Sequence, residues 1–250
     1  MARPYLSLII PAHNEAERLP ATLIDMDKHL SAAPYSYEIL VIDDGSSDKT
    51  TEVATKFAKL VKNLKVISNG ENKGKGAAVK QGMLLGRGEV RAFTDADHSA
   101  SISQFDEMTK HLSVAGKGSG DKYDLVVGSR FHKESELDPP PPFAGRLLEC
   151  VGGAILDKAL IKGGIRDVYC GFKAFTADAA ERIFTKSVVS GWGFDAEVLA
   201  LAGKMGMRIK EMPIVWSHDP QKVMPASAYL HIFGDAAKIA WWLNRGKYQM

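Results

Sequence analysis

Short apolar segments alternate with amphipathic segments through the first half of this 250-residue chain. Each apolar run spans four or five residues and is bounded by turn-forming residues, as expected for strands buried on both faces of a parallel sheet. The five runs are Leu6–Ile10, Glu38–Ile42, Leu64–Ile67, Val90–Thr94 and Asp124–Gly128. Strands and helices in this rhythm predict an α/β fold, with a Rossmann-like, mostly parallel central sheet and flanking helices.

Composition and charge narrow the class of protein. Hydrophobic residues make up 45% of the chain and charged residues 25%, which is ordinary for a soluble globular protein. The net charge of +2, without a block of like charge, argues against a nucleic-acid partner. The sequence contains neither a signal-peptide pattern nor an apolar stretch of spanning length. Cys150 and Cys170 have no metal-type spacing, which favours free thiols in a reducing compartment.

Polar residues follow each predicted strand. In an open α/β sheet, ligands bind beyond the carboxyl ends of the strands, so these segments should meet at one edge. They are Pro11–Glu15, Asp43–Ser46, Asn69–Lys73, Asp95–His98 and Ser129–Arg130. The sequence therefore predicts a ligand site built from acidic, amide and basic side chains at that edge.

Asp95 and Asp97 stand one residue apart after the fourth strand, so both carboxylates can reach one divalent cation. The spacing alone is weak, because a short motif of this kind arises by chance about once in a chain of this composition. Asp25 and Asp27 repeat it inside a predicted helix, where surface carboxylates are common. Position at the strand end therefore favours Asp95 and Asp97 as the metal ligands.

Other nucleotide-binding and hydrolytic folds fit the sequence less well. The sequence has no P-loop motif and no Gly-x-Ser-x-Gly elbow, and Gly74–Gly76 lacks the third glycine of the dinucleotide fingerprint. A nucleotidyltransferase or a non-catalytic sugar-nucleotide-binding protein remains an alternative, since both use paired carboxylates. The acidic segment Asn14–Glu17 counts against a nucleotidyltransferase, which usually has a basic, Gly-rich loop there.

Four motifs in this order resemble the family-2 inverting glycosyltransferases of the GT-A type; they are Leu8–Glu15, Val41–Asp48, Asn72–Gly76 and Asp95–Asp97. The second half is similar to the polyprenyl-phosphate hexosyltransferases within that family, at Val127–Arg130, Arg146 and Ile165–Lys173. Gly191–Glu197 resembles the glucosyl branch more than the mannosyl branch. The resemblance covers roughly residues 5–245.

The resemblance implies an inverting transfer of a hexose, glucose from UDP-glucose, to polyprenyl (dolichyl) phosphate, giving a β-linked product. A GDP-mannose-dependent enzyme of the same design remains an alternative. The resemblance also implies a glycosyltransferase domain over 1–225, with a nucleotide-sugar half at about 1–115 and an acceptor half at about 124–225. Residues 226–250 are predicted to form an amphipathic helix that packs on the sheet or faces a membrane. The expected location is the cytoplasmic face of a membrane, as a peripheral enzyme.

The resemblance also implies site residues. Those for the nucleotide sugar are Pro11, Ala12, Asn14, Glu15, Asp43, Asp44, Lys73, Asp95, Ala96 and Asp97. Asp95 and Asp97 would hold Mg²⁺ or Mn²⁺, with Ser99 as a weak further ligand.

Two further sets concern the acceptor and the reaction. Arg130 and Arg146 are the candidates for the acceptor phosphate, with Lys173 as a weaker candidate, since a lysine at such a position is more often a surface residue. The expected catalytic residues are Asp95, Asp97, Asp195 and Arg130. Asp195 would orient hydroxyls or the acceptor; the alternative is a helix N-terminal charge. Trp192 would form an apolar wall for the sugar ring.

Overall fold

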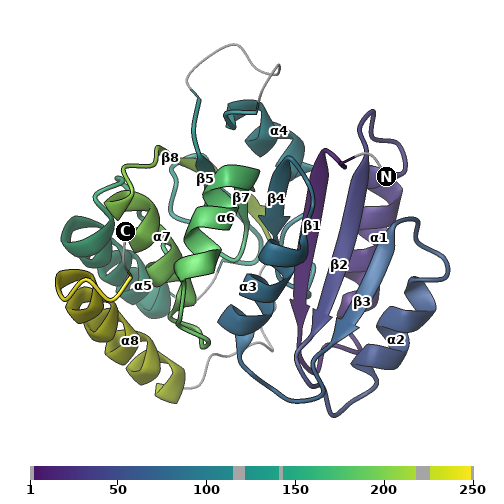
Figure 1. The fold of residues 1–250 in the computed structure, drawn as a ribbon, viewed down its shortest axis with the longest axis horizontal. Helices are drawn as coiled ribbons and strands as arrows, with labels where there is room; N and C mark the ends of the chain where they lie inside the picture. The colour runs from purple at the N-terminus through teal and green to yellow at the C-terminus, as the bar shows by residue number, and fades with distance from the viewer. Residues whose placement is uncertain (1–2, 115–121, 141–142, 218–225, 249–250) are drawn as a thin grey trace.

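A seven-stranded sheet in the order β3-β2-β1-β4-β7-β5-β8 runs through the molecule (Figure 1). The computed structural model describes residues 3–114, 122–140, 143–217 and 226–248, with the backbone alone at 143–149, 226–230 and 233. The strands are β1 Leu6–Ala12, β2 Tyr37–Asp43, β3 Leu64–Ser68, β4 Val90–Phe93, β5 Leu125–Ser129, β7 Lys173–Thr176 and β8 Ile209–Pro213. A second, small sheet pairs β6 Glu136–Leu137 with β9 Val215–Trp216.

The sheet is mostly parallel. β1 pairs in parallel with β2 and β4, β2 with β3, and β5 with β8. Only β7 is antiparallel among the seven described strands, and it lies between β4 and β5. The predicted α/β class and the five predicted strands are confirmed, whereas β7 and β8 were not predicted.

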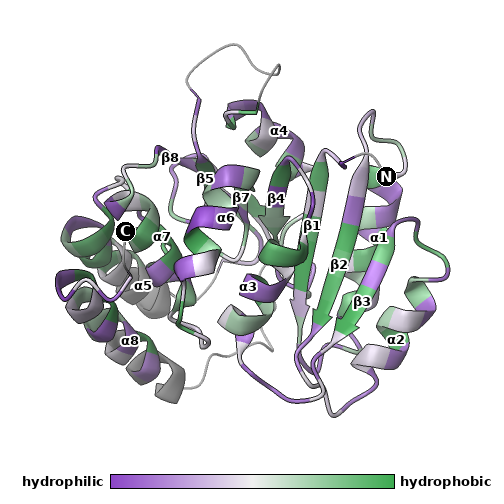
Figure 2. Cartoon of the chain, in the orientation of Figure 1, coloured by the Kyte–Doolittle hydropathy of each residue, from purple (hydrophilic) through white to green (hydrophobic). Residues whose placement is uncertain are grey.

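Two hydrophobic cores cover the two faces of the sheet. Side chains alternate along β1, so Leu8 and Ile10 pack in one core and Ile9 packs in the other. Because both faces are buried, the strands are nearly continuous apolar runs, as Figure 2 shows along β1 and β2. The first core includes residues from α1 Leu19–Leu30, α2 Thr50–Phe57 and α4 Gln104–His111.

The second core takes its helical residues from the other side of the sheet. It includes residues from α3 Lys75–Leu85, α6 Ala177–Lys186, α7 Phe194–Lys204 and α8 Ala226–Asn244. Helix α5, Phe143–Leu156, continues into a π-helical turn at Asp157–Ile161. Cys150 and Cys170 are both free thiols.

A helix forms where the C-terminal amphipathic helix was predicted. Helix α8 begins at Ala226 and contacts α7, with Ile232 and Ile239 buried. Trp241 on the same helix is 57% exposed. Within the described ranges, no helix combines the length and apolar character that crossing a bilayer requires.

Candidate active site

The strand ends that were predicted to carry the site lie side by side. Ala12, the last residue of β1, pairs in register with Asp43, the last residue of β2. On the other side of β1, the amide of Thr94 donates to the carbonyl of Ile9, which places the loop after β4 beside the loop after β1. Asp95 and Asp97 therefore stand at the same edge of the sheet as Asp43 and Asp44.

Asp95 is paired with a lysine that sequence reasoning missed. Lys75 Nζ lies 2.5 Å from Asp95 Oδ1, and both side chains are about five-sixths buried. A glycine lies under this carboxylate, because a Cβ added at Gly171 would stand 2.5 Å from Asp95 Oδ2. The Lys75 ammonium also lies 5.0 Å from the centre of the Trp192 ring. Asp95 thus lies between the Lys75 ammonium and the backbone at Gly171.

The loop that carries Asp97 is fixed from helix α1. Thr22 Oγ1 donates a 2.7 Å hydrogen bond to the carbonyl of Ala96, in the buried interior. Asp97 Oδ1 accepts from Ser99 Oγ at 2.6 Å, so Ser99 supports Asp97 in this structure. Asp25 Oδ2 accepts from the amide of Ile102 at 2.9 Å, which ties the following residues to the same helix. Asp25 therefore anchors the loop that follows the predicted metal ligands.

Asp95 and Asp97 fit a hard divalent cation. Their carboxylate oxygens are the donors that Mg²⁺ and Mn²⁺ take, and a bound cation would share the Asp95 carboxylate with the Lys75 ammonium, which lies 2.5 Å from Oδ1. Among the described residues no cluster of three or more His, Cys, Asp or Glu side chains forms a metal site. Two carboxylates suffice for Mg²⁺, which usually completes its shell with water and substrate phosphates.

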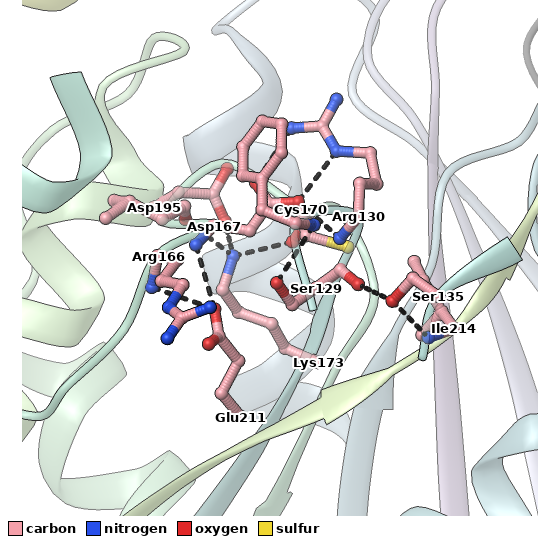
Figure 3. Close-up of polar contacts among 12 residues, drawn as sticks. Ser129, Arg130, Ser135, Arg166, Asp167, Cys170, Lys173, Asp195, Glu211 and Ile214 are labelled. Atoms are coloured by element: carbon pink, nitrogen blue, oxygen red, sulfur yellow. Dashed lines mark hydrogen bonds and ion pairs between the residues drawn. The ribbon is translucent and has the colours of Figure 1, made fainter. Parts of the chain in front are cut away.

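Asp195 is buried opposite Lys173 (Figure 3). The Lys173 side chain is fully buried, and its ammonium donates to Asp195 Oδ1 and to the carbonyls of Val168 and Cys170. Burial raises the pKa of Asp195, while the nearby ammonium groups of Lys173 and Lys75 oppose that shift.

The same contacts correct the interpretation of Lys173. All three ammonium hydrogens of Lys173 are used inside the protein, so the predicted contact with an acceptor phosphate does not fit this geometry. We assign Lys173 instead to holding Asp195. A lysine is rarely buried without a charged partner, and that partner stands 22 positions away in the sequence.

Arg130 forms a bidentate ion pair with Asp167 (Figure 3). Its Nε and Nη2 donate at 2.8 Å to the two carboxylate oxygens, and its backbone amide donates to Oδ2 at the same distance. Asp167 is almost fully buried, so the pair fixes the orientation of the guanidinium. Trp216 flanks that guanidinium, with its ring centre 5.6 Å away. Arg146 lies on α5, and its side chain is outside the described part of the chain.

The remaining predicted nucleotide residues build two linked loops. Asp44 accepts from the amides of Lys73 and Gly74 at 3.0 and 2.7 Å, which brings the loop after β3 to the end of β2. Asn14 Oδ1 accepts from the amide of Ser47 at 2.8 Å. Although burial acts to raise the pKa of Asp43, hydrogen bonds from Ser46, Thr51 and Ser68 bring it below its usual value.

The other members of this set lie on or next to the same loops. Pro11 and Ala12 end β1, and Ala96 is buried between the two predicted metal ligands. Glu15 pairs with Arg18 at 2.7 Å, and Lys73 is half-exposed with Glu71 3.5 Å away. The structure thus brings the predicted nucleotide residues to one edge, while their contacts with a ligand stay predictions.

Comparison with known families agrees with this architecture. The model of the family described as Glycosyl transferase family 2 matches residues 7–184. A dolichyl-phosphate beta-glucosyltransferase from Dictyostelium discoideum is 35% identical, over 94% of this chain and 73% of its own length. The protein of that name from Homo sapiens is 32% identical, over 92% of this chain and 73% of its own length.

Solved structures share the fold at lower identity. Glucosyl-3-phosphoglycerate synthase from Mycobacterium tuberculosis, in complex with Mg²⁺ and uridine-diphosphate, has a TM-score of 0.68 and 18% identity, covering 95% of this chain and 79% of its own. The same enzyme in complex with Mn²⁺, uridine-diphosphate and glucosyl-3-phosphoglycerate has a TM-score of 0.66 and 17% identity, covering 95% and 80%. Together with the family match, the fold and the residues at the ends of its strands show that this chain is a glycosyltransferase and belongs to glycosyl transferase family 2.

Proposed function

We propose that this glycosyltransferase moves glucose from UDP-glucose to dolichyl phosphate, with inversion at the anomeric carbon. The observation that carries the proposal is the placement of Asp95 and Asp97 just after β4, with Asp95 over Gly171 and beside Lys75. Support for the acceptor comes from relatives that are 32–35% identical over more than nine-tenths of this chain, and that are named dolichyl-phosphate beta-glucosyltransferases.

The donor would bind at the edge formed by β1, β2 and β4. Uracil N–H and ribose hydroxyls donate hydrogen bonds, so carboxylates such as Asp43 and Asp44 are suitable acceptors. Asp95 and Asp97 would hold Mg²⁺ or Mn²⁺, which when bound neutralises charge on the diphosphate as it leaves. Lys75, beside Asp95, adds a fixed positive charge at the same place.

The reaction would be a single displacement. An oxygen of the lipid phosphate attacks the anomeric carbon, a C–O bond forms, and the bond to the UDP oxygen breaks with its electron pair leaving on the diphosphate. The acceptor is already an anion at neutral pH, so no proton has to be removed. The site must instead hold two anions close together, which requires cations.

The arginines would supply that charge on the acceptor side. A guanidinium matches phosphate oxygens with parallel N–H donors, and Asp167 already fixes the plane of Arg130. Arg146 on α5 is the second candidate. Asp195, buried near Asp95 and held by Lys173, would help fix the polar groups around the sugar.

We also propose that the protein works at the cytoplasmic face of a membrane. Dolichyl phosphate keeps its charged group at the bilayer surface, so a peripheral enzyme can reach it. The 57% exposed Trp241 on α8 suits an interface, since tryptophan combines an apolar ring with a polar N–H. The acceptor half and α8 would then face the lipid.

The test is a transfer assay with three radiolabelled donors, UDP-glucose, UDP-GlcNAc and GDP-mannose, each mixed with dolichyl phosphate, with and without EDTA. We expect label in lipid from UDP-glucose alone, and none after EDTA. Label from GDP-mannose alone would show that the donor is GDP-mannose, as in the mannosyl alternative. Transfer that survives EDTA would show that the reaction does not need a divalent metal. Lipid without label from any donor would contradict the proposed function.

A further inference from the structure

We propose that Tyr248, which follows α8, is a positioning residue for the nucleotide-sugar site. Through Glu197 it holds the segment 188–193 against the N-terminal end of α3, and so keeps Lys75 beside Asp95. The inference rests on the proposed function for its consequence in donor binding, whereas the contacts themselves do not depend on it.

The first link is a buried carboxylate. Glu197 on α7 has no exposed surface, and an unpaired carboxylate there would be costly. Its Oε1 accepts from the Tyr248 hydroxyl at 2.8 Å and from the amide of Val188 at 3.0 Å. Its Oε2 accepts from the amide of Val189 at 2.9 Å. Glu197 thus joins Tyr248 to the start of the segment 188–193.

The second link is close backbone packing between that segment and α3. The amide of Ala77 donates to the carbonyl of Ser190 at 3.2 Å. A Cβ at Gly74 would stand 2.4 Å from the Ser190 oxygen, and one at Gly76 would stand 2.6 Å from the Val189 oxygen. Glycine on both sides of Lys75 therefore permits an approach that other residues would prevent.

The third link is the Lys75 side chain. Its ammonium lies 5.0 Å from the centre of the Trp192 ring and 2.5 Å from Asp95 Oδ1. Trp192 belongs to the segment 188–193, so the position of this segment sets one of the surfaces that confine Lys75. A cation near an aromatic face is attracted by the ring quadrupole, so the Trp192 ring favours this position of the Lys75 ammonium.

Tyr248 is itself well seated. It is 5% exposed, its ring meets Trp242 edge-on with centres 6.3 Å apart, and its carbonyl accepts from Lys186 Nζ at 3.3 Å. These contacts tie the residue to α6 and α8, while its hydroxyl reaches α7. Loss of the hydroxyl alone should therefore weaken the link to Glu197 and leave the ring in place.

The test compares Tyr248→Phe with Tyr35→Phe. Both variants remove a hydroxyl that donates to a carboxylate, since Tyr35 donates to Asp106 at 2.5 Å, but Tyr35 packs in the opposite core. The first measurement is hydrogen–deuterium exchange at Val188, Val189 and Ala77. The second is the Kd of UDP in the presence of Mn²⁺, by titration calorimetry.

We expect Tyr248→Phe to speed exchange at these amides by about fivefold and to weaken UDP binding by a similar factor, as for one lost hydrogen bond. Tyr35→Phe should change neither. A merely destabilised protein would show a lower binding stoichiometry with an unchanged Kd, and that result would overturn the proposal, as would unchanged exchange. Faster exchange with an unchanged Kd would refute the link to the site. If wild-type protein does not bind UDP, the proposed function fails, and the exchange data alone decide whether Tyr248 holds the segment.

Discussion

The buried pair of Lys173 and Asp195 gives the sharpest stability prediction. Lys173 has no exposed side-chain surface and Asp195 has 4%, so removing either charge leaves the other buried without its ion-pair partner. Breaking such a pair costs about 3–5 kcal/mol in unfolding free energy. For a chain of this size that loss corresponds to a fall in Tm of roughly 6–20 °C. We therefore expect Lys173→Met and Asp195→Asn each to lower the unfolding free energy and the Tm by these amounts.

The double variant separates a charge pair from general packing. Lys173→Met combined with Asp195→Asn leaves no buried charge, so it should be more stable than the sum of the single losses predicts. The expected coupling is about 1–3 kcal/mol, measured by urea unfolding monitored by circular dichroism. Additive losses, with no coupling, would refute the conclusion that the two charges hold each other.

The pH dependence gives a second check on the same pair. Burial raises the pKa of Asp195, so the neutral acid stabilises the folded state below the ordinary pKa, and this gain is lost as pH rises through the folded pKa. Without Lys173 the carboxylate should take up a proton more readily. The Tm deficit of Lys173→Met should therefore shrink between pH 7.5 and pH 5, and a deficit that stays constant over this interval would contradict the reasoning.

Three further predictions follow from single contacts. Gly171→Ala should displace the Asp95 carboxylate, since the new Cβ would stand 2.5 Å from Oδ2, and should lower the transfer rate by about a hundredfold, whereas Gly152→Ala, with open space around it, should not. Thr22→Val should leave the Ala96 carbonyl without its Thr22 donor, cost about 1–3 kcal/mol of unfolding free energy and raise the Mn²⁺ concentration for half-maximal transfer. The matched Thr55→Val, at an exposed position of α2, should not shift that concentration. Burial of Glu38 acts to raise its pKa, but hydrogen bonds from Arg87 and Ser7 bring the pKa below the ordinary value of 4.5. The ionised Glu38 therefore stabilises the fold above pH 4.5, and this stabilisation is lost as pH falls through the folded pKa. In acid denaturation, Glu38→Gln should therefore be less stable than wild type at pH 7 and lose less stability between pH 5 and pH 3; parallel curves would refute this.

Strands β1, β2, β4 and β5 could be predicted because they are buried on both faces and hence mostly apolar, whereas the parallel strand β8, Ile209–Pro213, is only partly buried and contains Lys210 and Glu211. β7 could not be predicted either, since Lys173–Thr176 begins with a lysine and ends with a threonine, which leaves only two apolar residues between them. The antiparallel pairing of β7 with β4 and β5 depends on contacts between segments far apart in the sequence. Local patterns carry no information about such contacts.

At the site too, some residues could be predicted from the sequence and others could not. Asp95 and Asp97 could be selected because a strand end places them at the ligand edge. Lys75 was missed, and Lys73 was preferred, because both follow the third strand and only the structure places Lys75 on Asp95. The one available signal was glycine on each side of Lys75, which permits the close backbone approach seen at Gly74 and Gly76. The partner of Arg130, Asp167, lies 37 positions away, and the spacing gave no sign of it.

The proposed reaction requires Asp95 to hold the cation under the departing diphosphate while the acceptor binds elsewhere. The most direct test measures the initial rate of glucose transfer from UDP-glucose to dolichyl phosphate for wild type and Asp95→Asn, together with the binding of each to vesicles that contain dolichyl phosphate. We predict that the substitution abolishes transfer and leaves lipid binding within about twofold, because the lost carboxylate acts on the donor side. Transfer at the wild-type rate, or an equal loss of transfer and lipid binding, would contradict the account.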